Sequence, residues 1–227
     1  MSKQRLPRKI EDYARVVFDC DGVLLDSNEL KSEMMGRALG DEPAEHIAAF
    51  VAYHRATGGV SRYVKYRHYF TEMYPRDNCE KEIEAAINRY AALVREGLLN
   101  CATLPGVSAL LNRLAAAGIP CFINSGGDEE ELREVMTARG MAQRFTAIFG
   151  SPATKSENLG RIAAITNGMP ALFIGDAKSD LDAAEADGLD FLFVSGVSEW
   201  EDGPDYCRHN GLAQIDTLDR IADIEPV

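Results

Sequence analysis

Residues Val16–Ser27 read VVFDCDGVLLDS, and two carboxylates follow directly on a short apolar run. Together with the two residues before it, this run has the length and β-branched content of a strand over 14–19. Asp19 and Asp21 are two residues apart, so on an extended chain they point to the same face and repel each other. A bound cation would offset that repulsion, and the stretch therefore predicts a metal site at the end of a buried strand.

Further short apolar runs follow later in the chain, and most of them end at Gly, Asn or Asp. Their near-continuous hydrophobicity is typical of strands that are buried on both faces of a parallel sheet. From residue 105 onward these runs alternate with amphipathic helical patterns. The sequence therefore predicts an α/β fold with a doubly wound parallel sheet. The strands expected after the first cover 119–124, 145–150, 171–176 and 190–194.

The stretch 27–104 breaks this alternation, because it contains no convincing strand. Within it, apolar residues recur every three or four positions over 79–99, which predicts one long amphipathic helix. Shorter helical patterns separated by Gly or Pro precede it. We therefore expect a helical cap at 27–104, inserted into an α/β catalytic core formed by 1–26 and 105–227.

The chain has 227 residues and a formal net charge of -12, with a pI of about 4.8. Such acidity argues against nonspecific binding to nucleic acid or to an anionic membrane surface. No apolar run reaches the length of a membrane span, and the basic start of the chain lacks the apolar segment of a secretory signal. The sequence predicts a cytoplasmic protein without nucleic-acid or membrane partners, and it leaves the oligomeric state open.

The distinctive polar residues follow the predicted strands. Ligands of open parallel sheets bind beyond the carboxyl ends of the strands, so these residues should converge at one edge. Asp19 and Asp176, with carbonyl oxygens and water, offer the oxygen ligands that suit Mg²⁺. Ser125, Gly126 and Lys155 offer donors for an anion. A metal, anion donors and a carboxylate together indicate phosphoryl transfer.

Charge decides whether Asp19 could act as the nucleophile. A carboxylate that attacks a phosphate dianion meets a repulsion of about 4 kcal/mol per charge pair at 4 Å, for an effective dielectric constant of about 20. The attack therefore requires Mg²⁺ and Lys155 to neutralise the phosphate. Asp19 would then form an aspartyl-phosphate. Asp21 would protonate the leaving oxygen and later deprotonate the water that cleaves the intermediate.

The set DCDG at 19–22, Ser125, Lys155 and GDAKSD at 175–180 resembles the haloacid dehalogenase-like hydrolase superfamily in order and spacing, over about residues 14–196. The continuation DGVLLDS, the Pro-Gly pair at 105–106 and the run GSPATK resemble its phosphatase branch with a helical cap. Residues 197–227 lie outside the resemblance.

The resemblance implies a Rossmann-like core and a role for each matched residue. These roles are the nucleophile and metal ligand (Asp19), the acid/base that also lends its backbone carbonyl to the metal (Asp21), the phosphoryl group's anchors (Ser125, Lys155), a metal ligand (Asp176) and a supporting carboxylate (Asp180).

The favoured function is a Mg²⁺-dependent phosphatase acting on a small phosphorylated metabolite such as a sugar phosphate. A sugar phosphomutase would use the same residues, and a non-catalytic binding protein could keep the same fold. The intact set of charged residues argues against the binding protein. A halide-removing enzyme is disfavoured because that branch typically lacks an acid at the position of Asp21. A signalling receiver domain is disfavoured because it carries no helical insert.

A basic segment lies within the expected cap. Between His46 and Thr71 there is no acidic residue, whereas several Arg and Lys residues occur there. These residues could form a solvated face or pair with acidic core helices such as DEEEL at 128–132. Alternatively, Arg55 and Arg62 could bind a second anionic or hydroxyl-rich group of the substrate. The sequence TGG at 57–59 would allow that loop to approach the core closely.

Overall fold

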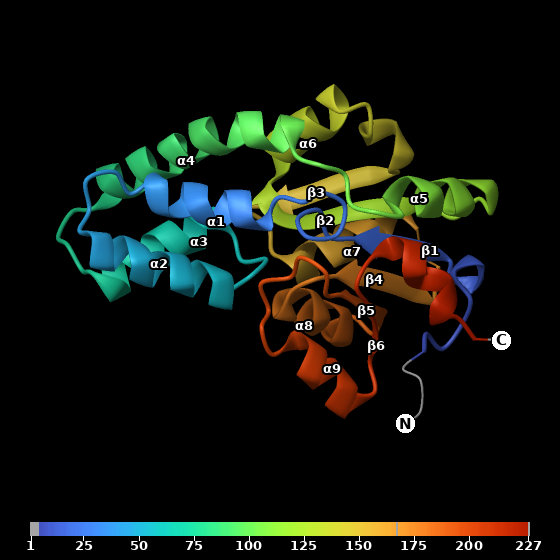
Figure 1. Cartoon of the computed structure of the whole chain (residues 1–227). Helices are drawn as coiled ribbons and strands as arrows, with labels where there is room; N and C mark the ends of the chain where they lie inside the picture. The colour runs from blue at the N-terminus through green and yellow to red at the C-terminus, as the bar shows by residue number, and fades with distance from the viewer. Residues whose placement is uncertain (1–4, 167, 227) are drawn as a thin grey trace.

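The computed structural model describes residues 5–166 and 168–226, and its core is a six-stranded, fully parallel sheet (Figure 1). The strand order is β3-β2-β1-β4-β5-β6, so β1 is central and the chain winds outward in both directions from it. This confirms the predicted fold class. The strands are β1 (Arg15–Phe18), β2 (Cys121–Asp128), β3 (Ala147–Ser151), β4 (Ala171–Gly175), β5 (Asp190–Val194) and β6 (Ala213–Ile215).

Strands β3, β4 and β5 lie within two residues of their predicted bounds, whereas β1 and β2 differ for a reason that the contacts show. Strand β1 ends at Phe18, because the amides of Leu24 and Leu25 both donate to the Cys20 carbonyl and turn the chain. Strand β2 continues past residue 124 through an irregular stretch and pairs again where Asp128 meets β3. The sixth strand was not predicted.

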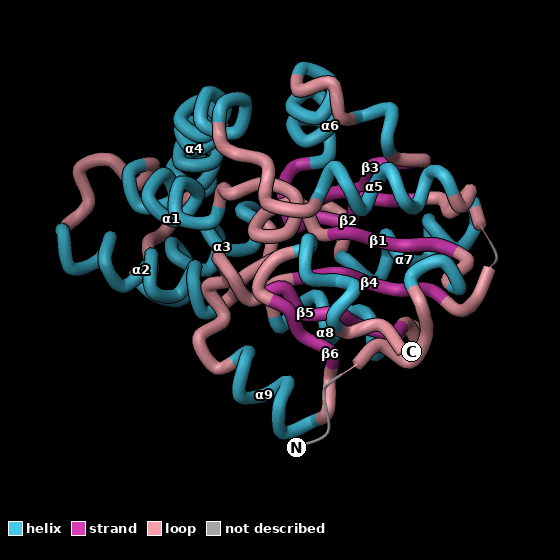
Figure 2. Tube along the Cα trace, turned by 45° about the vertical axis from the view of Figure 1, so that its right-hand side comes forward, coloured by secondary structure: helices cyan, strands magenta, loops and turns pink. Residues whose placement is uncertain are grey.

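Helices cover both faces of the sheet (Figure 2). The alternation of side chains along β1 directs Val16 and Phe18 into one apolar cluster and Val17 into the other. Helices α5 (Val107–Ala116) and α6 (Glu129–Ala138) contribute to the first cluster. The second cluster includes residues of α7 (Lys155–Ile165), α8 (Lys178–Ala186) and α9 (Gly203–Asn210).

A helical insert lies between β1 and β2, to one side of the sheet (Figure 1). Its interior is aromatic, since the Phe50 ring packs 5.2 Å from the Tyr66 ring and 5.1 Å from the Tyr69 ring. In the described part of the chain, no helix is both long and apolar enough to cross a membrane. The insert consists of α1 (Asn28–Arg37), α2 (Ala44–Ala56), α3 (Arg62–His68), the π-helical turn η2 (Tyr69–Met73) and α4 (Glu80–Asn100).

The two segments that join the insert to the core are paired with each other. The amide of Asp26 donates to the Ala102 carbonyl at 2.9 Å, and the amide of Leu104 donates to the Leu24 carbonyl at 3.0 Å. The crossing points therefore lie close to the predicted ends of the cap, although the boundaries at 27 and 104 stay a prediction. Residues 1–4, 167 and 227, which fall in the predicted core, lie outside the described residues.

The segment after β5 closes the core. Trp200 packs against Phe193 and Tyr206, with ring centroids 5.3 and 5.4 Å apart, respectively. The 3-10 helix η4 (Leu218–Asp223) buries Leu218 near the start of α5. Gly106, at the left-handed φ of 84°, leaves room for this contact, because an added Cβ would lie 2.0 Å from the Asp219 nitrogen. Two shorter 3-10 helices complete the structure, η1 (Ile10–Asp12) and η3 (Ala142–Arg144).

We predict that Gly106→Ala destabilises the protein more than Gly118→Ala does. Both glycines have a positive φ, but a Cβ at Gly118 would meet nothing within 4 Å. Gly118→Ala should therefore cost only the left-handed strain of roughly 1–2 kcal/mol. Gly106→Ala should cost roughly 1–3 kcal/mol more, because the backbone of η4 must move. Urea unfolding measures the free energy of unfolding of both variants. Equal losses of this free energy would contradict the packing of η4 against Gly106.

Candidate active site

The predicted polar residues meet at the carboxyl-terminal edge of the sheet. Asp19 directly follows β1, Asp176 directly follows β4, and Lys155 is the first residue of α7. Asp19, Asp21, Gly126 and Asp176 line one cavity of about 60 Å³. The walls of this cavity also include side chains from α1, α2, α3 and α4, so it lies between the core and the insert.

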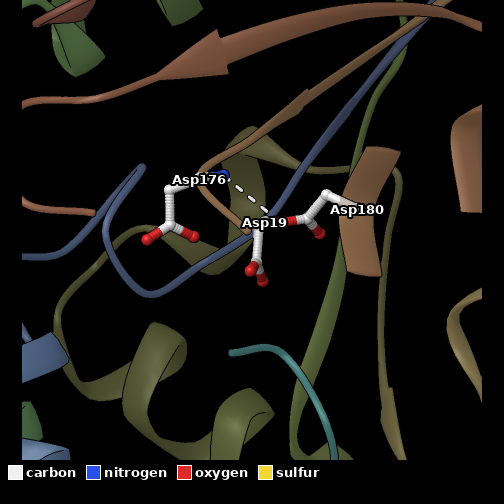
Figure 3. A group of neighbouring side chains, drawn as sticks. All are labelled: Asp19, Asp176 and Asp180. Carbon is white, nitrogen blue, oxygen red and sulfur yellow. Dashed lines mark hydrogen bonds between the residues drawn. The ribbon is translucent and has the colours of Figure 1, made fainter. Parts of the chain in front are cut away.

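Two of these carboxylates, Asp19 and Asp176, lie close to a third, Asp180 (Figure 3). Oxygen atoms of Asp19, Asp176 and Asp180 all lie within 4.8 Å of one another, and all three residues are buried. Burial raises the pKa of Asp19 to about 7, against the opposing effect of Lys155, and burial also raises the pKa of Asp176 well above its ordinary value. An all-oxygen, charge-rich set of this kind fits a hard divalent cation such as Mg²⁺.

Lys155 supplies the positive charge within this cluster. Its Nζ donates to Asp19 Oδ2 at 3.0 Å and also contacts Asp180. Burial alone would lower the pKa of Lys155, but the two carboxylates raise it, so the ammonium stays charged. The residue is held in place at the start of α7 because Thr154 and Glu157 form a reciprocal capping box there.

Asp180 orients the loop that carries Asp176. Its Oδ2 accepts a hydrogen bond from the backbone amide of Asp176 at 3.2 Å (Figure 3). The same oxygen accepts a second hydrogen bond, from the amide of Ala177, at 3.0 Å. Gly175 permits this approach, because an added Cβ would lie 2.3 Å from the Asp180 Cβ. These contacts support the position of Asp176, and Asp180 also contributes to the charge of the cluster.

Asp176 is held from the insert as well as from the core. The Asn28 side chain donates to Asp176 Oδ2 at 2.7 Å and to the Val197 carbonyl at 2.9 Å. Gly22 lies against the same carboxylate, because an added Cβ would be 2.1 Å from Asp176 Oδ2. The sequence offered no signal for Asn28, since its partner is 148 residues away.

The surroundings of Asp21 lower its pKa, whereas those of Asp19 and Asp176 raise theirs. Ser27 Oγ donates to its carboxylate at 2.6 Å, and Lys31 of α1 forms an ion pair with it. Burial would raise the pKa of Asp21, but Lys31 outweighs this and lowers it. The sequence indicated that the two aspartates share one face of a strand, and this expectation is wrong. The chain turns after Phe18, and each carboxylate has its own cation.

The loop at 125–127 brings backbone close to the insert. Ser125 is buried, and its Oγ accepts a hydrogen bond from the Gly127 amide at 3.0 Å. Gly126 packs against Gly59 of the insert, because an added Cβ would lie 2.1 Å from the Gly59 carbonyl oxygen. These residues belong to the irregular part of β2, whereas the sequence placed them after the end of that strand.

The loop at 57–59 approaches the core, as expected from its two glycines. Ser179 Oγ donates to the Gly58 carbonyl at 2.8 Å. A Cβ on Gly59 would lie 3.0 Å from Lys155 Nζ, so a side chain there would press on the residue that contacts Asp19. The insert therefore closes over the acidic cluster through backbone.

The two arginines that were expected to bind the substrate both form ion pairs with carboxylates of the protein. Arg55 is exposed and binds Glu29 and Glu199, and it does not line the cavity. Arg62 lines the cavity, is 4% exposed, and makes two hydrogen bonds to Glu131 at 2.8 and 2.9 Å. Glu131 belongs to the acidic segment 128–132, so the pairing considered as an alternative is present for Arg62. Substrate recognition by Arg55 and Arg62 stays a prediction.

The fold and this set of residues define a family. Residues 16–194 match the family described as haloacid dehalogenase-like hydrolase, and the chain belongs to it. No curated protein matches this sequence.

Solved structures share the fold along nearly the whole chain. A predicted phosphoglycolate phosphatase from Haemophilus somnus is 18% identical, with a TM-score of 0.72, and 95% of this chain and 99% of that chain are covered. A predicted phosphatase from Clostridium acetobutylicum is 21% identical, with a TM-score of 0.73 and coverage of 93% and 97%. A β-phosphoglucomutase from Clostridium difficile is 18% identical, with a TM-score of 0.66 and coverage of 92% and 93%. At these identities the likeness shows the fold alone.

We predict that Asp19→Asn stabilises the metal-free protein at alkaline pH. The folded state raises the pKa of Asp19 to about 7, so ionising this carboxyl as the pH rises from about 4 to 7 costs folding free energy. The asparagine cannot ionise and avoids that cost. In EDTA, the unfolding temperature of the variant should exceed that of the wild type at about pH 8, and the difference between the two temperatures should disappear toward about pH 4.

Added Mg²⁺ should raise the unfolding temperature of the wild type more than that of the variant, because a ligand that binds only the folded state stabilises it. A variant less stable than the wild type across the whole pH range would contradict the unfavourable charge at Asp19.

Proposed function

We propose that this protein is a Mg²⁺-dependent phosphatase that hydrolyses a small phosphorylated metabolite through an aspartyl-phosphate intermediate. One observation carries the proposal. Asp19 lies in a buried cluster with Asp176 and Asp180 and is bound by Lys155, whereas Asp21 lines the same cavity with a cation of its own, Lys31. A carboxylate beside a candidate metal site and a second carboxylate across the same cavity suit a division into nucleophilic and proton-transfer roles. We propose Asp19 for the first role and Asp21 for the second.

The metal ligands in this proposal are Asp19, Asp176 and the backbone carbonyl of Asp21, with Asp180 as the supporting carboxylate. When bound, Mg²⁺ would neutralise part of the charge on the phosphoryl group. Lys155 already opposes the negative charge of Asp19 and Asp180 without a metal. The roles of the other residues follow from their own contacts.

Asp19 is held for attack on phosphorus. Its Oδ1 accepts from the Cys20 amide at 2.7 Å, and its Oδ2 accepts from Lys155 at 3.0 Å. In the first step a bond forms between an Asp19 oxygen and phosphorus, and the bond from phosphorus to the leaving oxygen breaks. Ser125, Gly126 and Lys155 would hold the phosphoryl oxygens.

Asp21 would move the protons of both steps. In the structure it is bound to Lys31, which favours its ionised form. That form suits the second step, in which Asp21 takes a proton from the water that attacks phosphorus while the bond from phosphorus to the Asp19 oxygen breaks and phosphate is released. Donating a proton to the leaving oxygen in the first step requires a protonated Asp21, so it must first separate from Lys31.

The assay that tests the function is phosphate release from a panel of phosphorylated metabolites, with Mg²⁺ and with EDTA. Activity should require the metal, and Asp19→Asn should abolish it, because an amide is a poor nucleophile. Asp182→Asn is the matched control, since Asp182 is an exposed carboxylate of α8 that contacts Lys178. Substantial turnover by folded Asp19→Asn would overturn the nucleophile assignment, and an isomerised product without phosphate release would indicate a phosphomutase instead.

Asp21→Asn should slow turnover of an alkyl phosphate by roughly 10²–10⁴-fold, because the amide can neither give nor take the proton. The loss of phosphoenzyme formation should be much smaller for an aryl phosphate, whose leaving oxygen departs without protonation. Rapid-quench measurement of both steps checks this. Equal losses of the first step for both leaving groups would contradict the acid role.

A further inference from the structure

Lys65 of α3 is a buried cation that the proposed chemistry does not use. Its side chain lines the same cavity as Asp19 and Asp21, and the residue is 1% exposed. Its Nζ contacts the Nδ1 atom of His54 at 2.9 Å and donates to the His54 carbonyl at 3.0 Å. Within residues 5–166 and 168–226, no carboxylate lies within 4.0 Å of this ammonium.

The other basic side chains that line the cavity are paired. Lys31 binds Asp21, and Arg62 binds Glu131. Glu199 attracts Lys65 only from beyond ion-pair distance, and its carboxylate is already bound by Ser32 and Arg55. An unpaired charge in a buried site is costly, so the ammonium lacks a counter-charge that a ligand could supply.

The neighbouring imidazole is neutral and cannot supply that counter-charge. Burial, together with the charge of Lys65, lowers the pKa of His54 to about 2. The ring therefore accepts at Nδ1 and holds the ammonium in place without offsetting its charge. Burial likewise lowers the pKa of Lys65 to about 7, which reflects the missing anion.

We propose that Lys65 binds a second anionic group of the substrate, a carboxylate on the part of the molecule remote from the phosphoryl group. The inference rests on the proposed function, which places the phosphoryl group beside Asp19. One ammonium matches one negative charge, and a cavity of about 60 Å³ admits a small group. The substrate class is therefore a short phosphorylated carboxylic acid. In this proposal Lys65 makes the contact with a second anionic group that the sequence suggested for Arg55 and Arg62.

The first test compares matched substrates on the wild-type enzyme. Phosphorylated two- and three-carbon hydroxy acids are set against ethyl and propyl phosphate, which have the same length but no carboxylate. A charge-assisted contact of this kind should favour the acids by about 10- to 100-fold in kcat/KM, mainly through KM. Equal kcat/KM values within each pair would overturn the proposal and leave the phosphatase function standing.

The second test removes the charge with Lys65→Met. The preference for acids over alkyl phosphates should fall by about 10- to 100-fold. The variant should also unfold at a higher temperature than the wild type without ligand, because an unpaired buried charge is gone. Lys81→Met, which changes an exposed lysine of α4, is the control and should alter the preference by less than about twofold. A preference retained by folded Lys65→Met would overturn the assignment.

Calorimetric titration separates this proposal from the phosphatase function. The same acids and alkyl phosphates are titrated into the wild type and Lys65→Met under conditions without turnover. If the wild type binds the acids more tightly and the variant does not, the anion site stands even where no substrate is hydrolysed. If both proteins bind the acids and the alkyl phosphates equally well, Lys65 is not an anion site, whatever activity is measured.

Discussion

The concentration of negative charge at the end of β1 is the constraint on which the rest of the site depends. Three buried carboxylates lie within 4.8 Å of one another, and one lysine opposes them. Burial makes each uncompensated charge expensive, which is why the pKa values of Asp19 and Asp176 are raised. The cluster therefore favours a cation and, with it, an anionic ligand. Its cost to the ligand-free fold is of the kind that proteins accept at functional sites.

The insert completes this core site. Asn28 and Lys31, both in α1, bind Asp176 and Asp21, respectively. Gly59 packs beside Lys155, so the insert touches the acidic cluster through side chains and through backbone. The positions of the two key carboxylates consequently depend on how the insert is seated. Movement of the insert would break the contact of Lys31 with Asp21 and the contact of Asn28 with Asp176.

The basic segment of the insert contains residues in three different situations. Arg55 and Arg67 form exposed ion pairs, which contribute little to stability. Arg62 is buried and paired, so its charge is already used within the protein. Lys65 is buried without a carboxylate partner in the described part of the chain. The sequence shows only a run of positive charge. The packing of the insert decides which of these side chains already has a carboxylate partner within the protein and which does not.

The sequence by itself determined the fold class, five of the six strands and the gathering of Asp19, Lys155 and Asp176 at one edge. The reason is that strand patterns are local, and a parallel sheet brings all carboxyl ends to one side. Strand β6 is only three residues long and offers too little pattern to recognise. Only the tertiary structure decided that Lys31 pairs with Asp21, that His54 holds Lys65, and that Asp19 and Asp21 have separate surroundings. Those contacts join helices of the insert to one another and to the core, and their geometry comes from packing between segments that have no shared periodicity in the chain.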